Sequence, residues 1–502
     1  MNRILFICIF FISHLSFGQT YFERLLHIGN NNFLYEGDYL HSVFVLGDGS
    51  FIAAGNDKGT SNNKGAFIIK LSSKGDSLWT KFYGFDGVKM IKLLNGNYLL
   101  AGIDTSSLYS STLRLAEIDS NGNIISSHKP IYKSKPTTEY FNTLTQATDS
   151  SIVFSIYTNT SNGFVSTLTK LKKDYSLAWQ LTDTSFNNTY IRKAMIDEFG
   201  NTWLVSSKRL TLYKSQANFM KINTVGEIIS FKSIISNRSF NLRDFILDKN
   251  SQLLCTGIGN DTVMSGAPEK AMAIKLDSNF KIIWTKYYSP YESWYGDNIT
   301  NILPCNDGNF ALYGSITHKV YSGVNYLGSE AAALIKIDPN GKMLWANIYD
   351  NGQTYFDNNK GWFDGTIQVA RSVVQNTNGD FLLVGGKEFM VDNSSPNRGY
   401  QSYIVFANDS GYIGKNKPVS SVNEVFNQNL IQIYPNPANS KIHIISDGLR
   451  IESLELYDYK GLMVLHKEET GEIDVSAFPS GLYVIRCYTF EKIVTLKILI
   501  NH

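Results

Sequence analysis

A repeated pattern of strands and turns fills most of this 502-residue chain, from about residue 40 to residue 415. In each copy a polar turn with Gly, Asn or Asp precedes a short apolar strand. A second apolar strand, a second polar turn and a strand with Trp or Ile follow. The clearest copy runs from Gly47-Asp48-Gly49 through Ala66–Leu71 to Leu78-Trp79. A chain that repeats one such unit must stack its copies to bury a core, so the pattern restricts the fold to repeat architectures.

The spacing of the copies indicates which architecture this is. Seven copies align at the last strand of each, at Trp79, Ile125, Trp179, Ile229, Trp284, Trp345 and Ile413. Their mean spacing of about 56 residues leaves room for four short strands and their loops, the size of a β-propeller blade. No stretch of comparable length keeps the apolar period of an amphipathic helix, which argues against α/β folds. The sequence therefore predicts an all-β fold with a seven-bladed β-propeller; the alternative, a β-solenoid, usually has shorter repeats.

The segment Thr20–Ile28 precedes the first full repeat and has the pattern of a fourth strand. A propeller must join its first and last blades, commonly when one terminus lends a strand to the blade made by the other. We therefore expect this segment to pair with the last blade near Tyr403–Ile413. Such pairing covers two sheet edges that otherwise invite aggregation.

The first copy also carries a family resemblance. The string Ala66–Leu71, followed by Lys74-Gly75-Asp76, Leu78–Lys81 and Gly84, resembles the SBBP-type propeller repeats of secreted bacterial proteins. The resemblance covers most of residues 40–415 but consists of turn and core residues. It implies a fold and no particular activity.

The N-terminal segment Met1–Gly18 has the layout of a secretory signal peptide. Arg3 precedes an apolar run, Ile4–Ile12, and a polar stretch with small residues follows, which predicts cleavage before Gln19. The run is too short for a permanent transmembrane helix. A lipoprotein would need a Cys just after the run, but Cys8 lies in its middle. The expected partners of this segment are the Sec translocon and signal peptidase.

A polar stretch at residues 414–429 has the composition of a linker. Residues 430–502 then alternate short apolar runs with Pro, Asn and Gly turns, which predicts about six strands in a small Ig-like β-sandwich. The expected organisation is therefore a signal peptide at 1–18, a propeller at 19–413, a linker at 414–429 and a C-terminal domain at 430–502.

The C-terminal domain resembles a specific family. The strings Tyr434-Pro435-Asn436-Pro437, Leu456-Tyr457-Asp458 and Gly481-Leu482-Tyr483 are similar to the type A C-terminal sorting domain of the bacterial type IX secretion system. The resemblance implies recognition by the outer-membrane type IX translocon of a Gram-negative bacterium and cleavage by a sorting protease. Cargo of this system is released or attached to surface lipopolysaccharide. The resemblance assigns the sorting signal to Tyr434, Pro435, Asn436, Pro437, Gly481, Leu482, Tyr483 and Lys497.

The longest connections between strands all belong to blades five to seven. In an antiparallel blade, the connections between strands two and three, and those leading to the next blade, lie on one face of the disc. The sequence predicts long ones at 258–270, 315–330, 387–401, 287–298 and 349–367. These connections would form an irregular rim on one face, where loops on a rigid scaffold commonly bind ligands.

Two of the rim segments are rich in aromatic residues. Aromatic faces beside carboxylates suit stacking on sugar rings or holding a peptide. The alternative is that these rings pack the loops onto the disc while neighbouring acids, Asp297 among them, stay solvated. The candidate ligand-binding residues are Tyr291, Trp294, Tyr295, Tyr355, Phe356 and Trp362.

Searches for catalytic and metal-binding motifs are negative. The sequence has no His-Glu-x-x-His, Gly-x-Ser-x-Gly or Walker motif and no Cys or His cluster at metal spacing. We therefore predict no catalytic residue, no metal and no cofactor, and an enzyme is not favoured. The balance of 46 basic and 44 acidic residues argues against a nucleic-acid partner. Without Cys8, Cys255, Cys305 and Cys487 remain; Cys255 and Cys305 form either a disulfide or two buried thiols.

These observations predict a secreted or surface-attached protein that reaches the outside of the cell through the periplasm. The leading hypothesis is a binding or adhesion module for a glycan or peptide. The first alternative is an extracellular hydrolase or lyase that acts on polysaccharide or protein through rim carboxylates. The second is a structural surface protein without a small ligand.

Overall fold

The computed structural model describes residues 21–26, 38–57, 65–104, 112–129, 139–160, 163–182, 190–211, 214–248, 250–261, 269–290, 297–322, 325–349, 355–357, 362–364, 368–390, 398–413, 419–420, 431–446, 451–458, 462–468, 471–489 and 493–502. Every helix or strand in these ranges is a β-strand, so the fold class is all-β as predicted. A search of the same ranges for a long apolar helix that could cross a bilayer finds none. The chain divides into two compact units, Met1–Ser421 and Val422–His502, each described by itself below.

The described part of the first unit contains seven antiparallel sheets of four or five strands, numbered here sheet 1 to sheet 7 along the chain. Sheet 1 is β2 (Asp38–Val45), β3 (Phe51–Asp57), β4 (Gly65–Leu71) and β5 (Ser77–Tyr83). Sheet 2 is β6 (Asp86–Lys92), β7 (Tyr98–Asp104), β8 (Thr112–Ile118) and β9 (Ile124–His128). Sheet 3 is β10 (Glu139–Gln146), β11 (Ile152–Thr160), β12 (Gly163–Leu171) and β13 (Leu177–Thr182).

The later sheets repeat the same order. Sheet 4 is β14 (Tyr190–Ile196), β15 (Thr202–Thr211), β16 (Lys214–Ile222) and β17 (Ile228–Ser236), and sheet 5 is β18 (Phe240–Leu247), β19 (Leu253–Gly259), β20 (Lys270–Leu276) and β21 (Ile282–Tyr288). Sheet 6 is β22 (Asn298–Pro304), β23 (Phe310–Ser322), β24 (Asn325–Ile337) and β25 (Met343–Tyr349), extended by β31 (Val419–Ser420) from the predicted linker. Sheet 7 is β28 (Gln368–Gln375), β29 (Phe381–Met390), β30 (Arg398–Ala407) and β1 (Phe22–Leu26).

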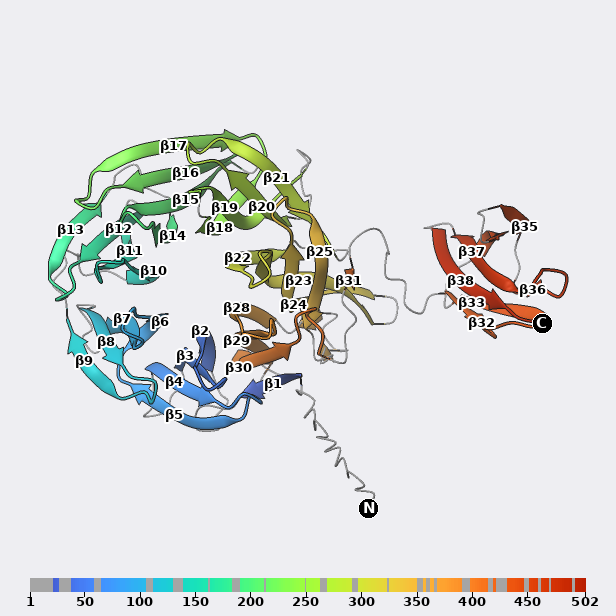
Figure 1. Ribbon diagram of the computed structural model, residues 1–502, viewed down its shortest axis with the longest axis horizontal. Helices are drawn as coiled ribbons and strands as arrows, with labels where there is room; N and C mark the ends of the chain where they lie inside the picture. The colour runs from blue at the N-terminus through green and yellow to red at the C-terminus, as the bar shows by residue number, and fades with distance from the viewer. Residues whose placement is uncertain are drawn as a thin grey trace, which may run out of the picture. The chain divides into compact units, whose positions relative to one another are not determined.

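The sheets surround a central opening in the manner of a β-propeller (Figure 1). The first strand of each sheet lies nearest the opening and the fourth lies at the outside. In sheet 7 the outer strand comes from the other end of the chain, because β1 pairs antiparallel with β30 from Phe22 opposite Phe406 to Leu26 opposite Ser402. Apolar side chains fill the space between adjacent sheets; one such cluster joins Ile52 of sheet 1 to Tyr98 of sheet 2.

Adjacent sheets are also joined at their outer strands by a recurring contact between Trp and Gly. Four half-buried Trp side chains each cover a glycine in the last turn of the next sheet. A Cβ atom added at these glycines would lie 2.6–2.9 Å from the indole ring. The pairs are Trp79 with Gly122, Trp179 with Gly226, Trp284 with Gly341 and Trp345 with Gly411. Glycine is therefore needed at this position both for space and for its positive φ.

Two interfaces reverse this arrangement. The register places Ser126 and Ser230, not the neighbouring Ile125 and Ile229, at the Trp position of the other two outer strands, and there the next turn carries an aromatic residue in place of Gly. Tyr175 of sheet 3 stacks on His128 of sheet 2, with ring centroids 4.1 Å apart. Phe280 of sheet 5 is fully buried and contacts aromatic rings of sheet 4. Six interfaces therefore receive one large ring, from one side or the other, and the interface between sheets 7 and 1 has the Arg24–Asp76 ion pair at this place.

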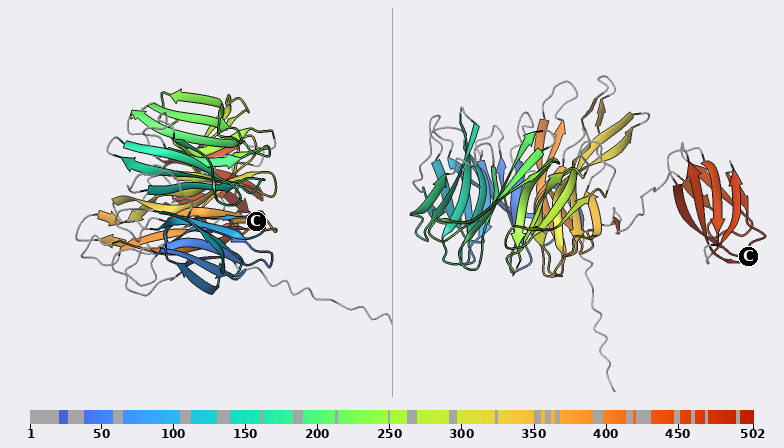
Figure 2. Two further views of the ribbon diagram at one scale, coloured as in Figure 1. Left: turned by 90° about the vertical axis from the view of Figure 1, so that its left-hand side faces the viewer. Right: turned by 90° about the horizontal axis from the view of Figure 1, so that it is seen from above.

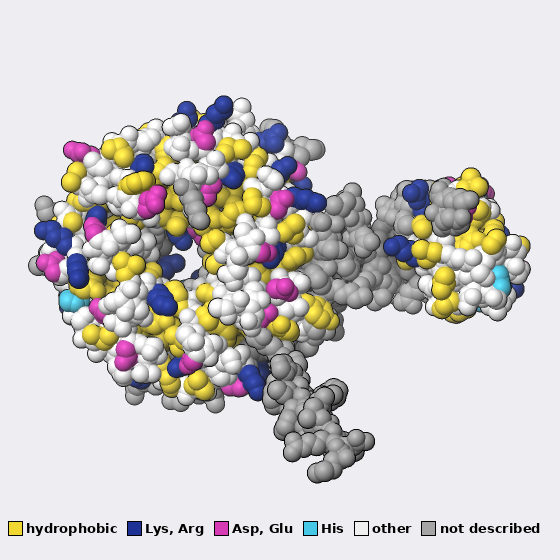
Figure 3. Space-filling model, in the orientation of Figure 1, with side chains coloured by type: hydrophobic (Ala, Val, Ile, Leu, Met, Phe, Trp, Pro, Cys, Tyr) yellow, Lys and Arg dark blue, Asp and Glu magenta, His cyan; other side chains and the backbone are white. Residues whose placement is uncertain are grey.

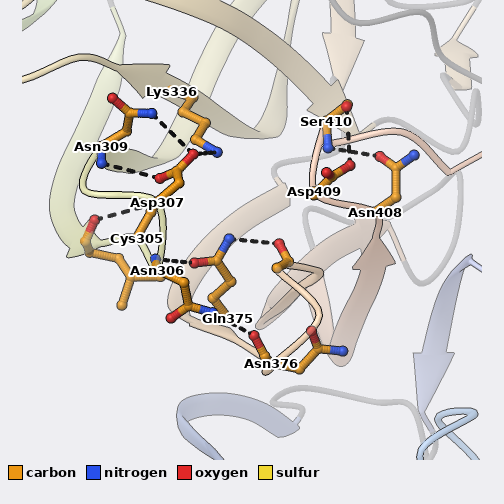
Figure 4. Close-up of polar contacts among 12 residues, drawn as sticks. Cys305, Asn306, Asp307, Asn309, Lys336, Gln375, Asn376, Asn408, Asp409 and Ser410 are labelled. Carbon is orange, nitrogen blue, oxygen red and sulfur yellow. Dashed lines mark hydrogen bonds and ion pairs between the residues drawn. The ribbon is translucent and has the colours of Figure 1, made fainter.

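The turns between the first two strands of each sheet hold polar contacts within and between sheets. In sheet 6, Lys336 Nζ lies 2.6 Å from Asp307 Oδ2, and Asn306 N donates to Gln375 Oε1 of sheet 7 at 2.8 Å (Figure 4). Burial raises the pKa of Asp307, but hydrogen bonds from Lys336 and Asn309 outweigh it, so the net pKa is lowered. Equivalent Asp–Lys pairs recur in sheets 1, 3 and 4. In these four sheets an ion pair therefore joins the turn between the first two strands to the third strand of the same sheet.

Two segments predicted to be long loops are mostly strand. Residues 315–330 continue β23 and β24 as a hairpin of two 13-residue strands, and 387–401 continue β29 and β30 as a hairpin of two 10-residue strands. The yellow strands β23 and β24 rise above one face of the disc (Figure 2). The prediction failed because polar residues along an exposed hairpin resemble a loop in composition. The cysteine question is also settled, since Cys255, Cys305 and Cys487 are free and buried.

The second unit consists of two antiparallel sheets around one hydrophobic core. The first has the order β32 (Ile431–Tyr434), β33 (Lys441–Ser446) and β36 (Glu472–Asp474). The second has the order β35 (Met463–Glu468), β34 (Ile451–Tyr457), β37 (Gly481–Thr489) and β38 (Ile493–Ile500). Both contribute to the core, with Ile442 from β33, Leu456 from β34 and Ile498 from β38 among its members.

The Trp–Gly contact predicts a difference between two glycines of the same sheet. Gly341 and Gly308 have φ of 78° and 79°, but only Gly341 lies under an indole, that of Trp284; nothing lies within 4 Å of a Cβ at Gly308. Gly308→Ala should lower the free energy of unfolding by about 1–2 kcal/mol through backbone strain alone. Gly341→Ala should lower it by a further ~1–3 kcal/mol through overpacking. Equal denaturation midpoints for the two variants would contradict the role given to the indole.

Candidate functional site

The Tyr-Pro-Asn-Pro motif of the second unit contacts the last strand of the chain. Asn436 Nδ2 donates to the Lys497 carbonyl at 3.0 Å, and Leu499 N donates to Asn436 Oδ1 at 2.9 Å. Ala438 continues the contact, because its N–H donates to the Leu499 carbonyl and its carbonyl accepts from Asn501 N, both at 2.8 Å. The two X-Pro bonds of the motif are cis. The motif therefore fixes β38 against the rest of the domain.

The residues assigned to the sorting signal differ in exposure. Tyr483 is buried and its hydroxyl donates to the Pro479 carbonyl at 2.9 Å, so it supports the fold. Tyr434 is 48% exposed and stacks on His443 with ring centroids 5.2 Å apart. Leu482 is 49% exposed and pairs across the sheet with Leu499, which is 42% exposed. Sequence reasoning missed Leu499, although the alternation of buried and exposed residues along β38 gives its side.

The candidate ligand-binding residues of the rim are only partly within the described residues. Tyr291, Trp294 and Tyr295 lie outside them. Tyr355 and Phe356 belong to β26 (Tyr355–Asp357), and Trp362 begins β27 (Trp362–Asp364), its antiparallel partner. In this hairpin Phe356 is opposite Phe363, and Asp357 is opposite Trp362. The backbone therefore brings three of the six candidates together, while ligand binding by all six stays a prediction.

Under the alternative reading of the rim, Asp297 is a solvated acid. The structure shows instead that it is buried and joins two sheets by a hydrogen bond. The carboxylate precedes β22 of sheet 6 and accepts from Ala271 N of sheet 5 through Oδ2 at 3.4 Å. Asp38 is the first residue of β2 in sheet 1, and its Oδ2 accepts in the same way from Ser402 N of sheet 7 at 3.1 Å. In each of these sheets the pairing of the first strand with the second shifts by one residue, and regular pairing resumes at Ser42 or Asn301. Asp38 and Asp297 each lie four residues before that point, so they occupy the same position of the repeat.

Burial raises the pKa of both carboxyl groups. It raises the pKa of Asp297 to about 7 and that of Asp38 to about 6, against the opposing effect of the backbone N–H donors. Glu330, which accepts a hydrogen bond from Ser315, also raises the pKa of Asp297, and Lys270 lowers it. No group of three or more His, Cys, Asp or Glu within the described ranges is arranged to hold a metal ion.

Comparison with protein families identifies the second unit. Residues 432–501 match the model of the secretion system C-terminal sorting domain. This confirms the resemblance to type IX sorting domains drawn from the Tyr-Pro-Asn-Pro and Gly-Leu-Tyr strings. A domain of this kind indicates export to the cell surface or extracellular space and interaction with the type IX secretion machinery.

Comparison with solved structures returns distant matches. A protein of unknown function from Dyadobacter fermentans is 13% identical with a TM-score of 0.41, covering 63% of this chain and 93% of that chain. The polysaccharide lyase Uly1 is 8% identical with a TM-score of 0.43, covering 76% and 94%. A subtype N10 neuraminidase-like protein of a little yellow-shouldered bat isolate from Guatemala is 9% identical with a TM-score of 0.35, covering 64% and 94%. None of the curated proteins matches this chain.

The raised pKa of Asp297 predicts a pH-dependent stability. The folded protein holds this proton up to about pH 7, whereas the unfolded chain releases it near pH 4, so stability falls as pH rises between these values. Asp297→Asn removes this fall and keeps an acceptor for Ala271 N. The denaturation midpoint of the variant should therefore rise relative to the parent from pH 4 to pH 8. One unit of pKa difference is worth about 1.4 kcal/mol, so the full effect is on the order of a few kcal/mol.

Asp409→Asn, a change at an exposed carboxylate, controls for the loss of one formal charge. Its midpoint should follow that of the parent across the same pH range. If Asp297→Asn also follows the parent, the buried carboxyl group does not hold its proton in the folded state.

Proposed function

We propose that this chain is an extracellular binding protein, a seven-bladed β-propeller that holds a glycan or peptide at its rim and is exported by the type IX system. The proposed export is supported by the sorting domain at residues 432–501. The proposed binding is supported by the long second and third strands of sheets 6 and 7 and by the aromatic hairpin β26–β27, which lies between these sheets in the sequence.

Support for a closed seven-bladed ring comes from contacts that join the two ends of the first unit. Beyond the pairing of β1 with β30, Glu23 Oε1 accepts a hydrogen bond from the Tyr403 hydroxyl at 2.7 Å. Arg24, also on β1, forms an ion pair of 2.7 Å with Asp76 in the last turn of sheet 1. In this proposal β1 completes the seventh blade and fastens it to the first.

Support for a binding rim comes from the unequal length of the hairpins. In sheet 1 the second and third strands have 7 residues each, whereas β23 and β24 have 13 each and β29 and β30 have 10 each. Elongation of this kind adds exposed surface on one face without adding to the core. Long hairpins and aromatic side chains both suit recognition of an extended polymer.

The remaining parts of the chain complete the proposed route. Residues 1–18 direct Sec export and are removed by signal peptidase, and residues 414–429 separate the propeller at 19–413 from the Ig-like sorting domain at 430–502. The type IX sorting protease then separates the sorting domain from its cargo, which is released or attached to lipopolysaccharide.

Replacing Trp294 and Trp362 with Ala should abolish or weaken by at least tenfold the binding of any ligand found on glycan and peptide arrays. The reason is the loss of two stacking faces from the rim. The matched control is Phe199→Ala, which removes a 70% exposed aromatic side chain from a turn between β14 and β15, on the face opposite the rim. Unchanged binding in the Trp variants excludes the rim. Product release from a polysaccharide or protein by the parent would favour the hydrolase or lyase alternative instead.

Deletion of residues 431–502 should leave the remaining chain in the periplasm, because the sorting domain carries the export signal. Cell fractionation measures this directly. A finer comparison uses Asn436→Ala, which removes both side-chain contacts with β38, and Asn439→Ala, an exposed residue of the same turn. Export should fall for the first and not for the second. Full export of the deleted chain would refute the type IX route.

A further inference from the structure

The sorting domain exposes apolar side chains on the outer face of its larger sheet. This sheet has the order β35, β34, β37 and β38, and Tyr483, Ile485 and Ile498 face the core. The residues that alternate with them face outward, and there Leu482 lies directly opposite Leu499. These two side chains are 49% and 42% exposed. Figure 3 shows hydrophobic side chains at the surface of this unit. Exposed apolar side chains that lie side by side are typical of a contact surface.

A cation extends this surface along the same two strands. Lys497 is exposed and lies directly opposite Val484, two residues along the strands from the leucine pair. Neither β37 nor β38 contains an Asp or Glu. The outward side chains of Leu482, Val484, Lys497 and Leu499 are called the Leu482 patch below. The patch therefore combines an apolar centre with a positive charge at one side.

The backbone edge of β38 beside this patch is already occupied. Asn436 makes hydrogen bonds with the Lys497 carbonyl and with Leu499 N. Ala438 makes hydrogen bonds with the Leu499 carbonyl and with Asn501 N. A partner cannot add a strand to this part of β38 without displacing the Tyr-Pro-Asn-Pro motif. Recognition at this end of the strand must therefore use side chains, and those that face outward are the Leu482 patch.

The residues assigned to the sorting signal divide into two groups by their contacts. Asn436 holds β38 in place, and Tyr483 packs in the core. Leu482 and Lys497 come from separate strings of the sequence, and their side chains face solvent on the same side of the sheet. The first group builds the domain. The second group is free to contact a partner.

The outer face of the smaller sheet is less suited to a partner. Lys441 Nζ lies 2.7 Å from Glu472 Oε1, and His443 Nδ1 lies 3.4 Å from Glu472 Oε2. Tyr434 stacks on His443. These groups already interact within the domain, so a partner that binds there must replace existing contacts.

We propose that the Leu482 patch is the surface through which the type IX machinery recognises this sorting domain. The complementary surface of the partner is an apolar pocket for Leu482 and Leu499 with a carboxylate group beside it for Lys497. This inference rests on the export route proposed above. It adds to that route the face of the domain that the partner contacts.

The test is export of full-length variants by the bacterium that produces the protein, measured as the ratio of extracellular to periplasmic protein. Leu482→Glu should lower this ratio about tenfold or more, because it places a charge in an apolar contact. The matched control is Met463→Glu, at a 50% exposed apolar residue of β35 on the opposite edge of the sheet. It should be exported as the parent is. Both purified variants should keep the denaturation midpoint of the parent, since both side chains are exposed.

A second pair of variants tests the cation of the patch. Lys497→Met should also reduce export, whereas Lys467→Met, which changes an exposed lysine of β35, should not. Photocrosslinking gives an independent measurement. A photoreactive residue in place of Leu499 should capture a component of the type IX machinery, identified by mass spectrometry, and one in place of Met463 should not.

The proposal is overturned if Leu482→Glu and Lys497→Met are exported as the parent is, or if Met463→Glu is retained to the same extent as Leu482→Glu. Neither result refutes the type IX route as long as deletion of residues 431–502 still prevents export. Export of the deleted chain would refute the route itself, so the two failures are distinguishable.

Discussion

The contact between one aromatic ring and the last turn of the next sheet is the constraint on which the ring of sheets depends. Each sheet packs only against its neighbours, so the whole unit is as stable as its successive interfaces. Large and small residues must therefore be matched across sheets. Trp284 requires Gly341, whereas the small Ser230 at the same position of sheet 4 allows the next turn to carry the buried Phe280. A change on one side alone leaves either a clash or a cavity.

This reciprocity also explains how far the sequence could predict the fold. The recurrence of Trp and Ile at one position was enough to find the repeat, its strands and the all-β class. It did not show that Ser126 and Ser230, rather than the neighbouring Ile residues, take the place of Trp, because the compensating aromatic residue lies about 50 positions later in another sheet, beyond the reach of a local pattern. Tyr175 and Phe280, which take the place of glycine at positive φ, look irregular until the interface is known.

The candidate sites were predictable to different degrees for a related reason. The sorting domain carries its signal in short contiguous strings such as Tyr434–Pro437, and the family match confirms it. The candidate rim residues come from separate segments of the chain. Composition therefore indicated which segments are aromatic but not how their side chains are arranged. Asp297 shows the limit: its neighbours in the chain suggested a solvated acid, whereas its position relative to the strand shift buries it against Ala271. Register, which decides the facing of every residue in a sheet, is not readable from one strand alone.

Net charge illustrates the same limit on a larger scale. The near balance of 46 basic and 44 acidic residues argues against a polyanionic partner over the whole surface. The net charge of the chain says little about the charges around the central opening, because at physiological ionic strength charges more than about 8 Å apart in solvent are largely screened from each other. Lys193 and Asp244 are about 50 residues apart in the chain, yet their charged groups lie 3.1 Å apart because both occupy the position at which regular pairing resumes. Specific charge contacts between sheets can therefore form in a protein whose overall charge gives no sign of them.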